Sequence, residues 1–317
     1  MRVVFMGTPD FAVATAQAIW DAGHQIVLVV TQPDKPKGRG GKVQYPPVKQ
    51  WAMEREIPVY QPKRIRDEEA VHMLREQTAD IFIVAAFGQI LPKDVLDIPP
   101  LGCVNVHASL LPKYRGAAPI QWAVINGDAV SGVTTMQMGE GLDDGDMLLK
   151  EEVVLAPDET GGSLFDRLAE VGGRLCVQTM EALAAGTIQP IPQDETQATH
   201  VGMIKKSLGD LDFTRSAEAL ERLVRGLNPW PSAYTRLEGK TLKIWRARVA
   251  EGCPECSGQA QALPAGQICY VADDGIYVAT GEGFLVLEEI QLEGKKRMAV
   301  ADFLRGRTIA PGTVLGS

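Results

Sequence analysis

Continuous apolar runs alternate with amphipathic stretches along the first half of the chain. Continuous runs are typical of strands that are buried on both faces, and helical spacing of apolar residues between them predicts helices. We predict strands over residues 2–6, 25–31, 80–87, 103–107 and 133–138, and helices over residues 9–21, 47–56, 67–77, 117–126 and 160–186. This alternation predicts an α/β fold with a Rossmann-like, doubly wound parallel sheet.

Two of the predicted helices begin with capping signals. Thr8 precedes Pro9, so we expect the Thr8 hydroxyl to cap a helix whose first residue is Pro9. Ser163 and Asp166 have the spacing of a capping box near the start of the long helix.

The second half of the chain has a different pattern. Residues 232–295 contain short strand runs broken by Gly, Pro and Asp, which predicts a small OB-like β-barrel, and residues 216–226 have helical spacing. Residues 187–206 carry Pro190 and Pro192 and show little periodicity, as linkers do. We therefore expect an α/β domain over residues 1–189, a linker over residues 190–207 and a C-terminal β-barrel domain over residues 208–317.

The composition is that of an ordinary globular protein, with 45% hydrophobic and 23% charged residues. No run is long and apolar enough to span a membrane, and the N-terminal strand lacks the features of a signal peptide, so we expect a cytoplasmic protein. Cys253 and Cys256 form a lone CxxC pair without a second pair, and we expect two free thiols. His24, His72 and His200 lack partners at ligand spacing, so we expect no metal.

Positive charge is concentrated in two segments of an acidic chain. The net charge is −8, with −7 in residues 1–207 and −1 beyond, so nucleic-acid contact would need local patches. Residues 34–49 and residues 234–248 each hold five basic residues against one acidic residue, and Trp245 lies within the second segment. A solvated surface explains such runs, and so does contact with a phosphate backbone. The second explanation predicts contacts from Lys35, Lys37, Arg39, Lys42, Lys205, Lys206, Arg236, Lys243, Arg246 and Arg248.

Asn105 and His107 are the first candidates for chemistry. They come at the end of the predicted strand 103–107 and, being two residues apart, they point to the same face. Ligands of open α/β sheets bind at the carboxyl ends of the strands. A neutral amide can donate to a developing oxyanion, and an imidazole can donate or accept a proton. The alternative is that both side chains satisfy the backbone of a turn.

Residues 141–146 form an acidic loop bounded by Gly141 and Gly145. A solvated turn is one explanation, and a calcium loop is disfavoured because no downstream Glu completes the ligand spacing. The functional explanation is that one carboxylate reaches Asn105 and His107 and holds the imidazolium or a proton-relaying water.

The first strand ends in Gly7-Thr8-Pro9-Asp10, which lacks the later glycines of the dinucleotide fingerprint. The most obvious alternative for such a fold, a nicotinamide-dependent dehydrogenase, is therefore disfavoured.

Three motifs together resemble the folate-dependent formyltransferases. They are Asn105-Val-His-Ala-Ser-Leu-Leu-Pro112, Arg115-Gly-Ala-Ala-Pro-Ile-Gln121 and Gly141-Leu-Asp143 followed by Gly145-Asp146. The N-terminal Gly7-Thr-Pro-Asp-Phe-Ala12, the basic segment through Lys42 and Asn228-Pro-Trp-Pro231 are similar to the members that act on tRNA.

The resemblance implies a reaction and a set of functional residues. The α-amine of initiator methionyl-tRNA would attack the formyl carbon of 10-formyltetrahydrofolate, the co-substrate, and tetrahydrofolate would leave. Asn105 and His107 would stabilise the oxyanion, and Asp143 would orient His107 and help to move protons. The folate contacts would come from Phe87, Gly88, Gln89, Ile90, Leu91, Ser109, Leu110, Leu111 and Pro112.

The resemblance also implies how the tRNA is held. The basic segment would contact the acceptor end of the tRNA, and the C-terminal barrel would contact its acceptor arm. We expect a monomer. Two other functions fit part of the pattern: a formyltransferase that acts on a small amine, which the two basic segments disfavour, and an RNA-binding module without catalysis, which the three catalytic residue types disfavour.

Overall fold

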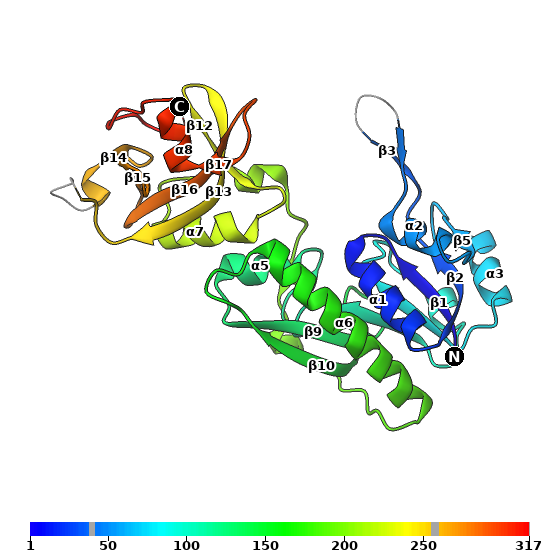
Figure 1. The fold of residues 1–317 in the computed structure, drawn as a ribbon. Helices are drawn as coiled ribbons and strands as arrows, with labels where there is room; N and C mark the ends of the chain where they lie inside the picture. The colour runs from blue at the N-terminus through cyan, green and yellow to red at the C-terminus, as the bar shows by residue number, and fades with distance from the viewer. Residues whose placement is uncertain (38–41, 255–259, 317) are drawn as a thin grey trace. The chain divides into compact units, whose positions relative to one another are not determined.

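The computed structural model describes residues 1–37, 42–254 and 260–316 (Figure 1). The chain divides into two compact units. Unit 1 comprises residues 1–119, 130–154 and 165–201, and unit 2 comprises residues 120–129, 155–164 and 202–317. Residues 190–201, predicted to begin the linker, group with unit 1. The domain boundaries proposed from the sequence stay a prediction.

Unit 1 is built on a seven-stranded sheet. Its strands are, in spatial order, β10 (Met147–Val154), β9 (Val130–Gln137), β7 (Cys103–His107), β6 (Ile81–Ala85), β1 (Arg2–Gly7), β2 (Gln25–Val30) and β5 (Val59–Tyr60). The strands from β7 to β5 are parallel, which confirms the predicted Rossmann-like class.

The predicted strand 133–138 exists as β9, but it runs antiparallel to β7, and β10 runs antiparallel to β9. A parallel crossover needs a helix that packs back onto the sheet. The helix between β7 and β9 is α5 (Pro119–Asn126), and its residues 120–126 group with unit 2 instead. β9 therefore returns directly beside β7.

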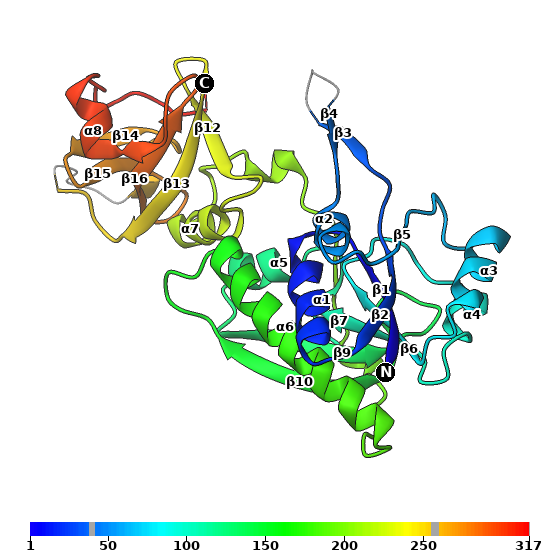
Figure 2. The ribbon, with the colours of Figure 1, turned by 45° about the vertical axis from the view of Figure 1, so that its right-hand side comes forward.

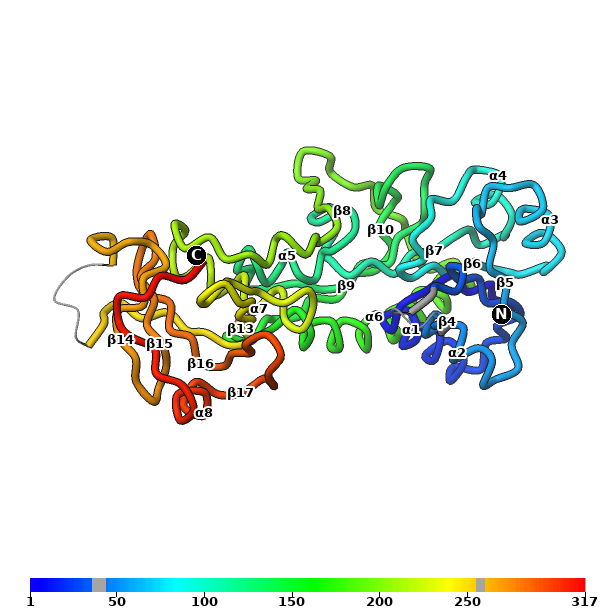
Figure 3. The backbone as a smooth tube through the Cα atoms, turned by 90° about the horizontal axis from the view of Figure 1, so that it is seen from above, coloured from blue at the N-terminus to red at the C-terminus, as the bar shows by residue number. Residues whose placement is uncertain are grey.

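Helices cover both faces of this sheet. They are α1 (Asp10–Asp21), α2 (Pro47–Met53), α3 (Glu68–Glu76), α4 (Lys93–Leu96) and α6 (Gly161–Ala184). Seen from above, α3 and α4 lie on one side of the strands, and α1, α2 and α6 lie on the other (Figure 3).

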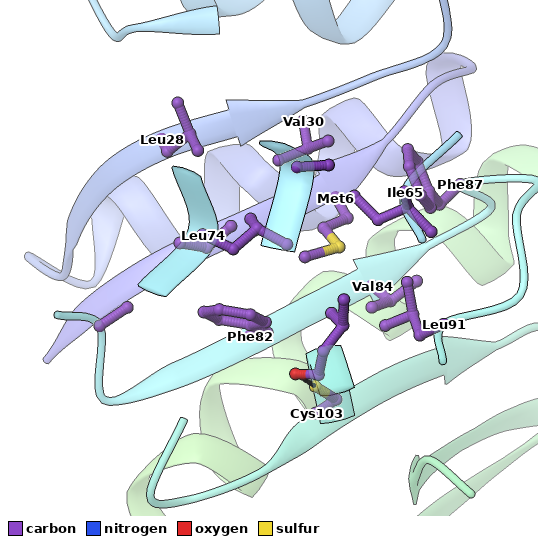
Figure 4. Packing of buried hydrophobic residues seen from close by; sticks show 14 of the residues in the cluster. Met6, Leu28, Val30, Ile65, Leu74, Phe82, Val84, Phe87, Leu91 and Cys103 are labelled. Atoms are coloured by element: carbon purple, nitrogen blue, oxygen red, sulfur yellow. Dashed lines mark hydrogen bonds between the residues drawn. The ribbon is translucent and has the colours of Figure 1, made fainter. Parts of the chain in front are cut away.

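Alternate residues of the parallel strands build the core under α3 and α4. Met6, Phe82 and Cys103 point to this side and pack with Leu74 of α3, as Figure 4 shows. On the opposite side Val106 approaches α6 so closely that a Cβ on Gly172 would lie 3.0 Å from its Cγ1. Glycine is unfavourable inside a helix by roughly 0.5–1 kcal/mol, and this close approach explains its presence.

Both predicted caps are wrong. Pro9 is itself the N-cap of α1, in an extended conformation, and the Thr8 hydroxyl instead donates to the Phe87 carbonyl. Helix α6 begins earlier than the predicted box requires: Thr160 and Ser163 bond each other's backbone N–H groups with their hydroxyls. The helix start therefore uses Thr160, so Ser163 already lies inside the helix.

Unit 2 is built on an antiparallel sheet. Its strands are, in spatial order, β12 (Ala233–Leu237), β13 (Lys240–Ala250), β16 (Phe284–Leu292), β15 (Gly275–Ala279) and β14 (Ile268–Ala272), with β17 (Met298–Ala299) on β16. Helix α7 (Ala217–Gly226) packs on β13, and α8 (Val300–Arg305) packs on β16. The fold class predicted for the C-terminal domain, an OB-like β-barrel, is confirmed as a domain of antiparallel strands. Cys253 is disulfide-bonded, so the expected free thiol there is wrong.

Short elements complete the fold. They are the hairpin β3 (Lys35–Lys37) and β4 (Lys42–Gln44), the parallel pair β8 (Arg115–Gly116) and β11 (His200–Val201), and the 3-10 helices η1 (Glu195–Gln197), η2 (Lys206–Gly209) and η3 (Ala260–Ala262). Within the described ranges, no helix has both the length and the apolar character that crossing a membrane requires.

Candidate active site

Asn105 and His107 lie in the last three residues of β7 and share one face of the sheet. Cys103, two residues earlier, packs in the core under α3 and α4, so residues 105 and 107 point to the same side. Both side chains are buried, with 9% of Asn105 and 6% of His107 exposed.

The loop between β9 and β10 brings a carboxylate to this face. Because β9 is antiparallel to β7, the loop leaves the sheet beside Cys103, where Met138 N donates to the Cys103 carbonyl. A hydrogen bond from Gln137 N to the Asp146 carbonyl closes the base of the loop. Between these points the loop folds back and places Asp143 against Asn105.

The Asp143 carboxylate has three neighbours. Its Oδ1 accepts a hydrogen bond from Asn105 Nδ2 at 3.2 Å. Its Oδ2 accepts one from the Gly116 backbone N–H at 2.9 Å and lies 3.7 Å from His107 Nδ1. Two neutral donors and one imidazole therefore converge on a single carboxylate.

The contacts of His107 define which of its nitrogens can exchange a proton. Nε2 lies 2.9 Å from the Tyr114 carbonyl, which can only accept a hydrogen bond, so Nε2 carries a hydrogen. Nδ1 is then the nitrogen that gains or loses a proton, and it faces Asp143. When Nδ1 is protonated, the ring and the carboxylate form an ion pair.

This arrangement can stabilise an oxyanion and move a proton. The Asn105 amide nitrogen has two hydrogens, and its contact with Asp143 uses one of them. Its second hydrogen and the proton on His107 Nδ1 are donors of the kind that stabilise tetrahedral intermediates in acyl transfer.

Polar residues of the segment 190–201 bond to Arg115 and to the loop that carries Asp143. Arg115, only 3% exposed, donates to Glu195 through both terminal nitrogens and to Gln193 Oε1 through Nε. The hydrogen bond from Arg115 lowers the pKa of the Glu195 carboxyl below its ordinary value, and the same contact raises the pKa of Arg115. Gln193 in turn donates to the backbone of the Asp143 loop.

Comparison with known proteins identifies the family. The Formyl transferase family model matches residues 1–180, and the Formyl transferase C-terminal domain model matches residues 203–308. A methionyl-tRNA formyltransferase from Agathobacter rectalis is 57% identical over 313 residues, 99% of each chain, and one from Lachnospira eligens is 56% identical over the full length of both. The chain belongs to the methionyl-tRNA formyltransferase family. It is therefore an enzyme that transfers formyl groups.

A solved structure with the same fold is HypX from Aquifex aeolicus in complex with tetrahydrofolic acid. The two are 17% identical with a TM-score of 0.60, and the alignment covers 96% of this chain. The chain spans about half of HypX, with 47% of that chain covered.

The residues predicted to contact folate in this formyltransferase fall into two groups. The side chains of Phe87, Leu91 and Leu111 are buried in apolar clusters, and the Ser109 hydroxyl donates to the Lys113 carbonyl. The others are partly or fully exposed: Gly88, Gln89, Ile90, Leu110 and Pro112.

Two groups of the segment 87–91 are already engaged within the protein. The Phe87 carbonyl accepts hydrogen bonds from Thr8 and Gln32, and the Gln89 amide bonds the backbone of Ile65 and Pro62. These contacts position the segment.

The basic segment forms the stem of a hairpin. β3 and β4 pair antiparallel, with Lys37 opposite Lys42, and extend beyond α2 in Figure 2. Lys35 is exposed. Arg39 lies outside the described residues.

The basic residues predicted in unit 2 have acidic neighbours that the linear sequence conceals. Arg246 and Arg248 both pair with Glu288, Arg248 also pairs with Asp274, and Arg236 pairs with Asp210. Lys243 lies over the Trp245 ring, 5.5 Å from its centroid. Antiparallel pairing of β16 with β13 brings Glu288 beside Arg246 and Arg248, and Asp210 forms a parallel bridge with Tyr234 of β12. The local positive charge is therefore smaller than the sequence count implies.

Lys205 and Lys206, at the start of η2, are exposed. Among the residues that the structure describes, no group of three or more His, Cys, Asp or Glu side chains is arranged to hold a metal ion.

Sequence reasoning missed three residues around Asp143. Gly116 and Arg115 were noticed only as part of a motif, and Gln193 was assigned to a linker. The arginine of the Arg115–Gln121 motif is a usable signal, because an arginine needs a carboxylate partner wherever it is buried. Gln193 gave no signal, because its partners are distant backbone carbonyls.

Proposed function

We propose that this formyltransferase transfers the formyl group of 10-formyltetrahydrofolate to the α-amino group of initiator methionyl-tRNA, giving N-formylmethionyl-tRNA for translation initiation. One observation carries the proposal: Asn105 Nδ2 and His107 Nδ1 lie 3.2 and 3.7 Å from the same carboxylate, that of Asp143. The names of the two full-length relatives support the choice of acceptor.

The reaction forms one C–N bond and breaks another. The α-amine attacks the formyl carbon, and the carbonyl oxygen becomes an oxyanion that accepts from the second hydrogen of Asn105 Nδ2 and from protonated His107 Nδ1. The amine nitrogen then loses a proton to a water held by the Asp143 carboxylate. Collapse of the intermediate breaks the bond to N10 of the folate, which gains a proton.

Asp143 pairs with the imidazolium and orients Asn105. Its 3.7 Å separation from His107 Nδ1 is too long for a direct hydrogen bond, so the Nδ1 proton can be directed at the oxyanion. We propose that the water held by Asp143 passes the amine proton on to N10 of the folate. No step of this mechanism requires a metal ion.

Folate binding is proposed for the exposed part of the predicted set. Gly88 and Ile90 follow β6, whose neighbour β7 carries Asn105 and His107, so they lie near the same end of the sheet. Leu110 and Pro112 lie three and five residues after His107. The buried side chains of Phe87, Leu91 and Leu111 would support the residues that contact folate from the core side. HypX, crystallised with tetrahydrofolic acid, has this fold.

We propose that tRNA contacts Lys35, Lys37 and Lys42 of the hairpin strands, together with Arg39, Lys205 and Lys206. Phosphate contact by lysine and arginine weakens as salt rises, because bound counterions are released. In unit 2 we propose that Lys243 contacts the tRNA most readily. Arg236, Arg246 and Arg248 are paired with carboxylates, and each would have to break its ion pair before it could bind a phosphate of the tRNA. A monomeric, cytoplasmic enzyme fits this role.

The substrate assignment is tested with an acceptor panel. The purified protein is given 10-formyltetrahydrofolate with methionyl-tRNA, free methionine or a small amino sugar, and the formylated amine is quantified. We expect formylation of methionyl-tRNA alone. Formylation of a free amine at a comparable rate would contradict the tRNA assignment, while no formylation of any acceptor would contradict the activity itself.

A further inference from the structure

The β9–β10 loop carries Asp143 in a conformation that the loop does not favour by itself. Asp143 has a φ of 53°, in the left-handed region that non-glycine residues rarely adopt. Such a conformation persists when surrounding structure fixes it. The base of the loop is closed by the Gln137–Asp146 hydrogen bond, which lies three residues from Asp143.

Gln193 hydrogen-bonds the part of the loop that contains Asp143. Its Nε2 donates to the Asp143 carbonyl at 2.8 Å and to the Gly145 carbonyl at 2.7 Å. An amide nitrogen has two hydrogens, so these contacts use both. The two carbonyls belong to the residues on either side of Asp144, and the first of them is that of Asp143 itself, whose carboxylate faces Asn105.

Arg115 determines which way the Gln193 amide points. A guanidinium only donates hydrogen bonds, and Arg115 Nε donates to Gln193 Oε1 at 3.0 Å. Gln193 must therefore direct its nitrogen toward the loop. Arg115 is buried and is held by two hydrogen bonds to Glu195.

The same region also holds the Asp143 side chain. Gly116, the residue after Arg115, donates its N–H to Asp143 Oδ2, and it pairs in β8 with Val201 of β11. The carboxylate of Asp143 is thus held by Gly116 of the β8–β11 pair, and its backbone is held by Gln193.

We propose that Gln193 is a positioning residue that sets the Asp143 carboxylate against Asn105 and His107. The inference rests on the proposed function, because its kinetic consequence is a change in formyl transfer. Gln193 acts through the Asp143 backbone.

The test compares three variants of the full chain. Gln193→Ala removes both donors, and Gln193→Glu keeps the shape and the contact with Arg115 while removing both donors. Gln197→Ala is the matched control, because its amide lies on the same segment but donates to Asp194. We expect both Gln193 variants to lower kcat by roughly 10–100-fold, as misplacement of a reacting group does. We expect KM for both substrates to stay within about twofold of wild type.

A second measurement separates positioning from general destabilisation. In an Asp143→Asn background, adding Gln193→Ala should change kcat by less than about twofold, because the two changes act on one group. An equal loss in both backgrounds would overturn the proposal, as would a wild-type kcat in both Gln193 variants. If Gln193→Ala does not fold, the kcat of Gln193→Glu tests the proposal by itself, since a glutamate can still accept the hydrogen bond from Arg115.

A spectroscopic readout distinguishes this inference from the proposed function. The side-chain amide resonance of Asn105, assigned by its absence in Asn105→Ala, should shift in Gln193→Glu and stay in place in Gln197→Ala. An unmoved resonance would overturn the positioning role. If wild type formylates no acceptor while the Asn105 resonance shifts in Gln193→Glu, only the proposed function is overturned.

Discussion

Asn105 Nδ2 lies 3.2 Å from Asp143 Oδ1, although 38 positions separate the two residues in the chain. Asn105 is placed by β7, a central strand, whereas Asp143 is placed by a loop that leaves the sheet at the other end of β7 and folds back. The site therefore joins a rigid part, the strand, to a part that depends on supporting contacts.

Replacing Asn105 tests the rigid part. Asn105→Ala removes a donor to the oxyanion, and we expect kcat to fall by about 100–1,000-fold, the usual cost of such a loss. Asn105→Asp should be at least as harmful, because it also places a second carboxylate beside Asp143. Gln137→Ala is the control, since that amide bonds the Cys103 carbonyl of the same strand. Steady-state kinetics with methionyl-tRNA would show the difference, and equal rates for Asn105→Ala and Gln137→Ala would refute the role.

Gly116 tests the supporting contacts. A Cβ at this position would lie 2.3 Å from the Val201 carbonyl oxygen, and the residue has a φ of 110°. Gly116→Ala should therefore separate β8 from β11 and disturb the N–H that holds Asp143, with a loss of stability on the order of 1–3 kcal/mol. We expect a lower urea midpoint and a lower kcat. Gly202→Ala, where a Cβ meets no atom within 4 Å, should leave both unchanged.

Glu195 links the stability of this region to pH. The hydrogen bond from Arg115 lowers its pKa in the folded state, so its contribution is present above the unfolded value, near 4.5, and is lost as pH falls through the folded pKa. The melting temperature of wild type should therefore fall as the pH is lowered below about 4.5. Glu195→Gln should be less stable than wild type at pH 7, and the difference should narrow on acidification. A difference that widens toward low pH would contradict this linkage.

Cys103 is predicted to be unreactive although it lies two residues from Asn105. Burial raises the pKa of its thiol to about 12, and the thiolate is the reactive form. Iodoacetamide at pH 8 should therefore leave Cys103 unlabelled in the native protein and label it in urea, as peptide mass spectrometry would show. The pKa of Cys176 is also raised to about 12, so it serves as an internal comparison. Rapid native labelling at Cys103 alone would mean that β7 opens locally.

The strand that carries the proposed catalytic residues Asn105 and His107 is the part of the fold that the sequence determines best. β7 was predicted with the correct bounds, because its residues are buried on both faces and its neighbours supply every backbone partner. β10 was missed because Lys150, Glu151 and Glu152 interrupt its apolar pattern at a sheet edge. The direction of β9 was wrong because it depends on where α5 packs.

The hydrogen bonds that support the site could not be predicted from the sequence, for a related reason. The hydrogen bonds of Gln193 go to backbone carbonyls, which every residue has, so nothing in the side-chain pattern marks the partner. The acidic partners of Arg246 and Arg248 come from other strands or turns, so a count along one segment overestimates the charge.

The central claim is that Asn105, His107 and Asp143 transfer a formyl group to methionyl-tRNA. The most direct test is the single-turnover rate of N-formylmethionyl-tRNA formation by wild type and by His107→Ala, with both substrates saturating. The account predicts formation by wild type and a loss of at least about 100-fold in the variant, as removal of an oxyanion donor costs. Equal rates in the two proteins would contradict it, because the proton on His107 Nδ1 would then have no part in the reaction.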